Sequence, residues 1–164
     1  MRIQNDIPIG VISDTHGYLP PKVKDIFKRV QLILHAGDLG GYVIYRELQQ
    51  IAPVLAVRGN NDIALEYNTL SPTEGALLED DSLLYMVHDL TCLTLDPVVS
   101  KCRIIIHGHT HVPMYTEKNG VIFINPGSAS HPRRGSGPSV GLLTIQRTEI
   151  TWDLIELLKK DLNQ

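Results

Sequence analysis

Apolar runs of strand length alternate with helical segments along the first third of the chain. Residues 7–13, 31–35 and 53–57 are short apolar runs, and each predicts a buried strand. Residues 42–50 predict a short helix, and an earlier helix begins near Pro21, because proline suits the first turn of a helix. The apolar face of that earlier helix, at helical spacing, consists of Val23, Ile26, Phe27 and Val30.

The second half of the chain is richer in strands. Two apolar runs flank an Asp-Asp-Ser turn, a buried run follows at 103–106, and an Asn-Gly pair predicts a hairpin. Residues 91–100 are interpreted as an irregular stretch with a helical turn, and the last ten residues as a short helix or a frayed tail. The other predicted strands are 76–78, 83–87, 114–116, 121–124, 140–145 and 150–154.

This order of elements predicts an α/β protein in which two packed sheets are flanked by helices. The chain has 164 residues, of which 43% are hydrophobic and 20% charged, an ordinary globular composition. We expect one domain over residues 1–164, since this length is typical of a single domain. The loosely composed segment 127–139 is interpreted as a surface loop and not as a domain boundary.

The charge and the cysteine content limit which cellular compartment and which kinds of binding partner are expected. The chain has 15 Lys and Arg against 18 Asp and Glu, a net charge of −3, which argues against nucleic-acid binding by bulk charge. The apolar runs are too short for a membrane-spanning helix, and the first residues lack the pattern of a signal peptide. Cys92 and Cys102 are therefore expected to stay reduced. We expect a cytoplasmic protein with no membrane partner.

Polar residues gather where the predicted strands end. Residues 14–16 (Asp-Thr-His) follow the first strand, and 35–38, 59–62 and 107–111 hold further groups of His, Asp and Asn. In an open α/β sheet the carboxyl ends of the strands meet at one rim, where ligands bind. Glycines within three of the groups allow sharp turns and close approach to a ligand.

Such a set of side chains favours a metal site. Imidazole together with carboxylate and amide oxygens suits Mn, Fe, Zn, Ni or Co, whereas a magnesium or calcium site would use oxygen ligands almost alone. The set offers more ligands than one ion needs, so two ions that share a carboxylate are the economical interpretation. Two ions about 3.5–4 Å apart can clamp a phosphoryl group and activate a bridging water.

The motifs resemble the five sequence blocks of the calcineurin-like metallophosphoesterase superfamily, from about residue 9 to residue 145. The segments HGHTHVP and NPGS resemble its small prokaryotic phosphodiesterase branch, the YfcE type. Each block alone is weak, whereas five in this order are a strong signal. The blocks are Asp14-x-His16, Gly37-Asp38, Gly59-Asn60, His88 and Gly108-His109-x-His111.

The resemblance implies a four-layer fold, with two mixed sheets packed as a sandwich and helices outside. It also implies a metal-dependent phosphodiesterase, with phosphomonoesterase activity as an additional expectation, that attacks a small phosphodiester with a hydroxide bridging two metal ions. Manganese is the first choice, and Ni, Zn, Fe and Co are alternatives. The first ion would be held by Asp14, His16, Asp38 and His111. The second would be held by Asp38, Asn60, His88 and His109.

Two positions depart from the family pattern. The family usually has glycine after the fourth-block histidine, and here Asp89 follows His88, so His88 as a structural histidine stays an alternative to His88 as a ligand. Many members have a histidine that protonates the leaving group directly after the third-block asparagine, and here Asn61 takes its place. Asn61 can donate a hydrogen bond but cannot give up a proton. It is the weak candidate for a catalytic role.

Other roles stay open at the level of sequence. Asn60 and Arg133 are candidates for substrate contact, and for Arg133 a solvated position is an equal alternative. His35 and His107 are interpreted as hydrogen-bonded neighbours of the site. The main rival function is a non-catalytic metal-binding or protein-interaction scaffold, as in the retromer subunit of this fold. A nuclease lacks support, because no basic strip is present, and a homodimer or homotetramer is a family-level expectation.

Overall fold

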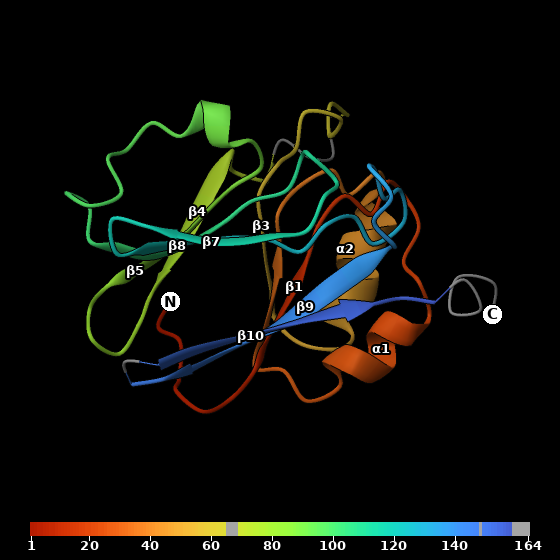
Figure 1. Ribbon diagram of the computed structural model, residues 1–164. Coiled ribbons are helices and arrows are strands. Elements are labelled where there is room, and N and C mark those ends of the chain that lie inside the picture. The colour runs from red at the N-terminus through yellow and green to blue at the C-terminus, as the bar shows by residue number, and fades with distance from the viewer. Residues whose placement is uncertain (65–68, 148, 159–164) are drawn as a thin grey trace.

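The computed structural model describes residues 1–64, 69–147 and 149–158, which form two five-stranded sheets. Figure 1 shows the two sheets, with the two α-helices of the described residues on one side of the molecule. The first sheet has the order β10-β9-β1-β2-β3 and the second the order β4-β5-β6-β8-β7. The elements are β1 (Ile9–Ile12), α1 (Lys22–Phe27), β2 (Leu32–His35), α2 (Tyr42–Gln49), β3 (Val54–Ala56), β4 (Thr73–Leu77), β5 (Leu83–Val87), η2 (Leu90–Cys92), β6 (Cys102–Ile106), β7 (Met114–Lys118), β8 (Val121–Asn125), β9 (Ser139–Gln146) and β10 (Glu149–Glu156).

Both sheets are mixed. In the first, β1, β2 and β3 are parallel. β9 pairs with β1 in the antiparallel direction, and β10 pairs with β9 in the antiparallel direction. In the second, β5, β6 and β8 are parallel, and β4 and β7 are antiparallel edge strands. Each sheet thus has a centre of three parallel strands, whose carboxyl ends can present loops to a common site.

The main core lies between the two sheets. Side chains alternate along each strand, so Val11, Leu34, Met86 and Ile106 point into this layer, where all four are fully buried. On the other face of the first sheet, Ile12 and Ile33 pack against the buried sides of α1 and α2. At 25 cal/mol per Å² of apolar surface removed from water, this burial is the main source of stability.

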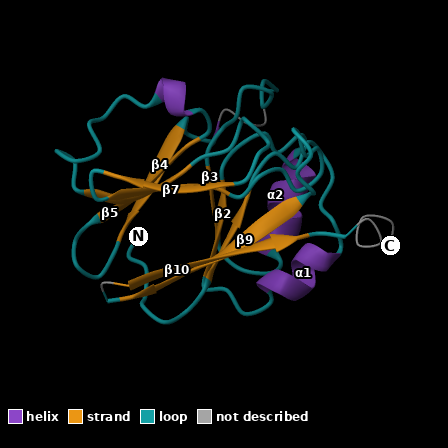
Figure 2. Cartoon of the chain, in the orientation of Figure 1, coloured by secondary structure: helices purple, strands orange, loops and turns teal. Residues whose placement is uncertain are grey.

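In the described residues, α-helices cover the outer face of the first sheet but not that of the second. The outer face of the second sheet carries Cys102, Ile105 and Val121, which pack against side chains of the irregular segment 88–101. That segment contains one 3-10 turn, η2, visible as the short helix above β4 in Figure 2. The sandwich of two mixed sheets is therefore confirmed, while the expected flanking helices cover the first sheet alone.

The predicted strands and helices are present with small differences in their ends. The Asn-Gly pair closes the β7–β8 hairpin, and Asn119 and Gly120 both have positive φ, 54° and 76°, as a two-residue turn of this type requires. Of the last ten residues, Ile155 and Glu156 still belong to β10, and residues 159–164 lie outside the described residues. None of the described helices is long and apolar enough to cross a membrane.

Candidate metal centre

The loops after β1, β2, β3, β5 and β6 meet at one rim of the sandwich. Backbone hydrogen bonds join the first two loops, since Asp14 N–H donates to the carbonyl of Gly37 at 3.0 Å and His16 N–H to that of Asp38 at 3.0 Å. The second sheet joins them where His109 N–H, after β6, donates to Oδ2 of Asp14 at 3.2 Å. The structure therefore brings the predicted polar groups together from both sheets.

The backbone itself is unusual at five of the predicted ligands. Each has a positive φ, a backbone conformation that residues other than glycine rarely adopt because the side chain clashes with the backbone. Strain of this kind persists only where the surroundings fix it, and it clusters at functional sites. The five residues are Asp14 (φ 53°), His16 (φ 44°), Asp38 (φ 57°), His109 (φ 66°) and His111 (φ 60°).

Two of the predicted glycines, Gly59 and Gly108, leave space for the carboxylates of Asp38 and Asp14. A Cβ atom on Gly59 would lie 2.1 Å from Oδ1 of Asp38. A Cβ atom on Gly108 would lie 2.0 Å from Oγ of Ser13 and 2.7 Å from Oδ2 of Asp14. Any larger residue would push these groups apart, so both positions require glycine for space.

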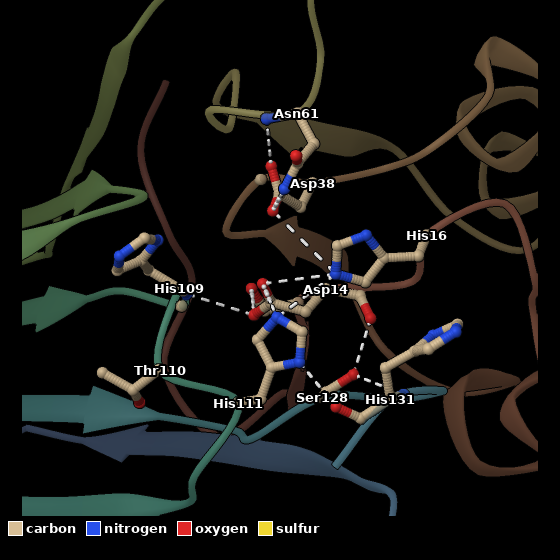
Figure 3. Close-up of polar contacts among 12 residues, drawn as sticks. Asp14, His16, Asp38, Asn61, His109, Thr110, His111, Ser128 and His131 are labelled. Atoms are coloured by element: carbon tan, nitrogen blue, oxygen red, sulfur yellow. Dashed lines mark hydrogen bonds and ion pairs between the residues drawn. The ribbon is translucent and has the colours of Figure 1, made fainter. Parts of the chain in front are cut away.

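The first predicted ligand set is assembled in the structure. Donor atoms of Asp14, His16, Asp38 and His111 all lie within 4.8 Å of one another (Figure 3). Nε2 of His111 lies 3.2 Å from Nε2 of His16 and 3.2 Å from Oδ1 of Asp14. Nε2 of His16 lies 3.9 Å from Oδ2 of Asp38. Both carboxylates and His111 are buried, so the group faces a largely enclosed point.

The hydrogen bonding of Asp14 fits a cation at this point. Oδ2 accepts hydrogen bonds from the hydroxyl of Ser13 at 2.6 Å and from His109 N–H at 3.2 Å, whereas the buried Oδ1 has no hydrogen-bond partner. A buried oxygen without a partner is costly, and a bound cation beside it would offset that cost. The donor set of two imidazoles and two carboxylates suits a divalent transition metal.

The pKa shifts of the group have clear causes. Burial raises the pKa of the Asp14 carboxyl and lowers the pKa of the His16 imidazole. Burial would also raise the pKa of Asp38, but hydrogen bonds from His88 and Asn61 outweigh it and hold that pKa well below its ordinary value. Asp38 is therefore ionised and His16 neutral near pH 7, which are the forms that bind a metal ion.

The second predicted set converges on the side-chain oxygen of Asn60. Its Oδ1 lies 3.1 Å from Nε2 of His88 and 3.0 Å from Nδ1 of His109. Nε2 of His88 is also 3.5 Å from Oδ2 of Asp38, so Asp38 lies between the two sets. The other ring nitrogen of His88 is 2.7 Å from the carbonyl oxygen of Ala36, which orients Nε2 toward the site. The burial of His88 is thus compatible with a ligand role.

Asn61 contacts the shared carboxylate. Its side-chain amide donates to Oδ2 of Asp38 at 2.6 Å, and its backbone N–H donates to Oδ1 at 2.8 Å (Figure 3). Both bonds favour the ionised carboxylate and fix its orientation. In this arrangement both donors of Asn61 are engaged with Asp38.

Two buried histidines, His35 and His107, lie next to the ligands without facing them. Nε2 of His35 is 3.0 Å from Oγ1 of Thr15, and Nδ1 accepts from Gly37 N–H at 3.2 Å, so the ring joins the first two loops. Burial lowers the pKa of His35 to about 3 and that of His107 to about 4. Both are neutral hydrogen-bonding residues, in agreement with their sequence interpretation.

Two buried polar residues with a role in shaping the loops were not predicted. Asn125 donates to the carbonyl of Gly108 at 2.7 Å and accepts from Gly127 N–H at 2.8 Å, which fixes the loop that carries His109 and His111. Asp62 accepts from Gly59 N–H at 2.9 Å and from Gly40 N–H at 3.2 Å. Their sequence signal, a polar residue two or three positions from a glycine, does not differ from that of an ordinary turn.

The segment 127–139 forms one wall of the site. The hydroxyl of Ser130 donates to the carbonyl of Thr15 at 2.8 Å, and the carbonyl of His131 lies 2.5 Å from Nδ1 of His111. An open cleft of about 420 Å³ is lined by His16, His111, His131, Pro132 and Arg133. Arg133 is exposed and contributes to the lining of this cleft.

Comparison with known proteins agrees with this geometry. Residues 7–148 match the model of the calcineurin-like phosphoesterase superfamily domain. A probable metallophosphoesterase of Methanothermobacter thermautotrophicus is 35% identical over 90% of this chain and 91% of its own. Phosphodiesterase YfcE of Escherichia coli K12 is 29% identical over 80% and 84% of the two chains.

A solved structure confirms the fold. Chaetomium thermophilum Vps29 has a TM-score of 0.79 at 23% identity and covers 94% of this chain and 89% of its own, a likeness of fold alone. The family match spans most of the chain and includes all the predicted ligands. The chain therefore belongs to the calcineurin-like phosphoesterase superfamily, whose enzyme class is that of the metal-dependent phosphoesterases.

Proposed function

We propose that this protein is a phosphodiesterase that uses two divalent transition metal ions, with manganese as the first choice. The observation that carries the proposal is the position of Asp38 between two groups of ligand atoms. One group consists of Asp14, His16 and His111 on one side of this carboxylate. The other consists of Asn60, His88 and His109 on the opposite side. The bridging-hydroxide mechanism expected from the resemblance is part of this proposal.

The chain's own residues prepare the site for phosphoryl chemistry. When bound, the two ions would activate a water molecule and neutralise charge on the phosphoryl oxygens. Asn61 holds the shared carboxylate in place through two hydrogen bonds. Arg133 at the rim would bind a phosphate oxygen and orient the ester. This arrangement needs no side-chain nucleophile.

The cleft favours a small substrate. It is open on one side, and its lining combines imidazoles with one arginine, so we propose a small phosphodiester, with monoester hydrolysis as a side activity. Nickel, zinc, iron and cobalt are alternatives to manganese, because the same donor set accepts all of them. A cytoplasmic location, one domain over 1–164 and a homodimer or homotetramer stay predictions.

Hydrolysis of bis-p-nitrophenyl phosphate by chelator-stripped protein tests the proposal. Mn, Ni, Co, Zn and Mg are added back separately, and Asp38→Asn is measured beside wild type. We expect metal-dependent hydrolysis that falls at least about 10²-fold in Asp38→Asn, since the variant removes the shared charge. Asp25→Asn, an exposed change on α1, is the matched control and should retain full activity.

The opposite result identifies the rival function. If wild-type protein binds metal ions but none of the five metals supports hydrolysis, the phosphodiesterase proposal is wrong. The non-catalytic scaffold then becomes the better interpretation. Unchanged hydrolysis in Asp38→Asn would instead show that another part of the chain carries the activity.

A further inference from the structure

Asp89 is the residue by which this chain departs from the usual glycine after His88. One carboxylate oxygen, Oδ1, accepts a hydrogen bond from Thr91 N–H at 2.9 Å and caps the 3-10 turn η2. The other oxygen, Oδ2, lies 3.6 Å from Nε2 of His109. Because the cap fixes the first oxygen, the second is held in a fixed position facing the His109 ring.

His109 has the most exposed side chain of the four predicted histidine ligands. Its side chain is 43% exposed, compared with 5% for His88 and 4% for His111. In Figure 3 its ring lies on the opposite side of Asp14 from His16. Its Nδ1 faces Asn60 at 3.0 Å, so Nε2 is the nitrogen that points away from the proposed second ion.

Two of the other three predicted histidine ligands, His88 and His111, each have an oxygen near the ring nitrogen that faces away from the site. Nδ1 of His88 is 2.7 Å from the carbonyl of Ala36, and Nδ1 of His111 is 2.5 Å from the carbonyl of His131. Each ring thus has an oxygen acceptor on the side away from the site, and such an acceptor fixes the orientation and tautomer of a metal-binding histidine. For His109, the oxygen on that side belongs to the carboxylate of Asp89, which at 3.6 Å from Nε2 lies at ion-pair distance and beyond hydrogen-bond length.

We infer that Asp89 is a positioning residue, which orients His109 and strengthens its hold on the second metal ion. The negative charge of the carboxylate beside Nε2 favours the tautomer with the proton on Nε2, which leaves Nδ1 unprotonated and directed at the ion. The same charge also makes the imidazole a stronger ligand than a backbone carbonyl would. The inference rests on the proposed two-metal function. It explains why Asp89 in place of glycine would strengthen metal binding by His109, the most exposed of the histidine ligands.

Asp89→Asn separates the positioning role from the structural one. The asparagine Oδ1 can still cap Thr91 N–H, and this bond directs the Nδ2 amide toward His109 in place of the acceptor. Asp96→Asn is the matched control, because Asp96 caps Val98 N–H and Val99 N–H in the same manner away from the ligands. His109→Ala identifies the binding step that belongs to the second ion.

Chelator-stripped proteins are titrated with Co²⁺, and binding is followed by calorimetry and visible absorption. For wild type we expect two ions per chain. In Asp89→Asn we expect the step lost in His109→Ala to weaken about 10–100-fold, while the other step is unchanged. Asp96→Asn should bind like wild type. The melting temperatures of the metal-free proteins are measured in parallel and should agree.

Two results would overturn the inference. In one, Asp89→Asn binds both ions as wild type does. In the other, both steps weaken together and the melting temperature of the metal-free variant falls, which indicates a structural role only. Wild type that takes up a single ion and hydrolyses no diester would contradict the proposed function itself, so the two failures are distinguishable.

Discussion

At the scale of single residues, Asn61 decides how the leaving group can be handled. Its amide and its backbone N–H are both engaged with Asp38. An amide cannot give up a proton, and this one donates to the carboxylate of Asp38. The position at which many superfamily members carry an acid therefore serves to hold the shared carboxylate in this chain.

We accordingly predict that hydrolysis depends steeply on the leaving group. A general acid contributes about 10²–10⁴-fold, and without one the poor leaving groups lose this factor while good ones do not. A series of methyl aryl phosphodiesters with substituted phenols measures kcat/KM against phenol pKa. The background of Asp38→Asn is subtracted at each point. A flat dependence would show that another group supplies the proton.

At the scale of elements, the strands and their ends were predictable, whereas the outer layers were not. Each parallel strand is a compact apolar run that stops at a polar group, so residues such as Asp14 and His88 could be placed at a common rim. The cover of the second sheet comes from Leu90, Leu93 and Leu95 in an irregular segment. These leucines pack without a helical period, and no sequence pattern distinguishes them from a loop.

The loop after β3 provides a prediction at this scale. Gly59→Ala should displace Asp38, because the new Cβ would lie 2.1 Å from Oδ1 and 2.3 Å from the backbone nitrogen of that residue. We expect a loss of about 1–3 kcal/mol in the free energy of unfolding, typical of overpacking, together with weaker metal binding. Urea unfolding and metal titration measure the two effects.

Gly41→Ala is the control for this change. Gly41 has an extended φ of 165°, and its Cβ would meet only a methyl group of Val43 at 3.4 Å. Its stability and metal affinity should stay close to wild type. Equal metal affinity in Gly59→Ala and wild type would mean that the loop can shift without moving the carboxylate.

At the scale of the whole molecule, the meeting of Asp14, His16, Asp38 and His111 at one point could be predicted, but the hydrogen bonds that hold the loops could not. Asp14, Asp38 and the histidines belong to motifs with fixed spacing. Asn125 reaches Gly108 across 17 positions of sequence, and Ser130 reaches Thr15 across 115. Contacts of this kind depend on the packing of both sheets, which no local pattern reveals. The sequence therefore predicts the chemistry of the site better than the support around it.

The buried histidines also make the stability of the whole fold depend on pH. Burial lowers the pKa of His35 to about 3 and of His107 to about 4, whereas both titrate near about 6.5 in the unfolded chain. Above the unfolded-state pKa, these two histidines do not reduce the free energy of unfolding. As the pH falls below it, the free energy of unfolding decreases, because the unfolded chain then binds protons that the folded chain excludes. His88 opposes this loss, since its raised pKa favours the folded state at low pH.

For the metal-free protein we predict a lower free energy of unfolding at pH 5 than at pH 7, by on the order of 2 kcal/mol for each of the two histidines. The raised pKa values of His88 and Asp14 oppose this difference, and the lowered pKa of His16 adds to it. Urea unfolding at both pH values measures the difference, and His35→Gln should reduce it by about one histidine's share. The variant also loses bonds to Thr15 and Gly37, so its stability is lower at both pH values, and only the difference between them is diagnostic. An equal difference in wild type and His35→Gln would mean that His35 is protonated in the folded chain, and its place between the first two loops would then need another explanation.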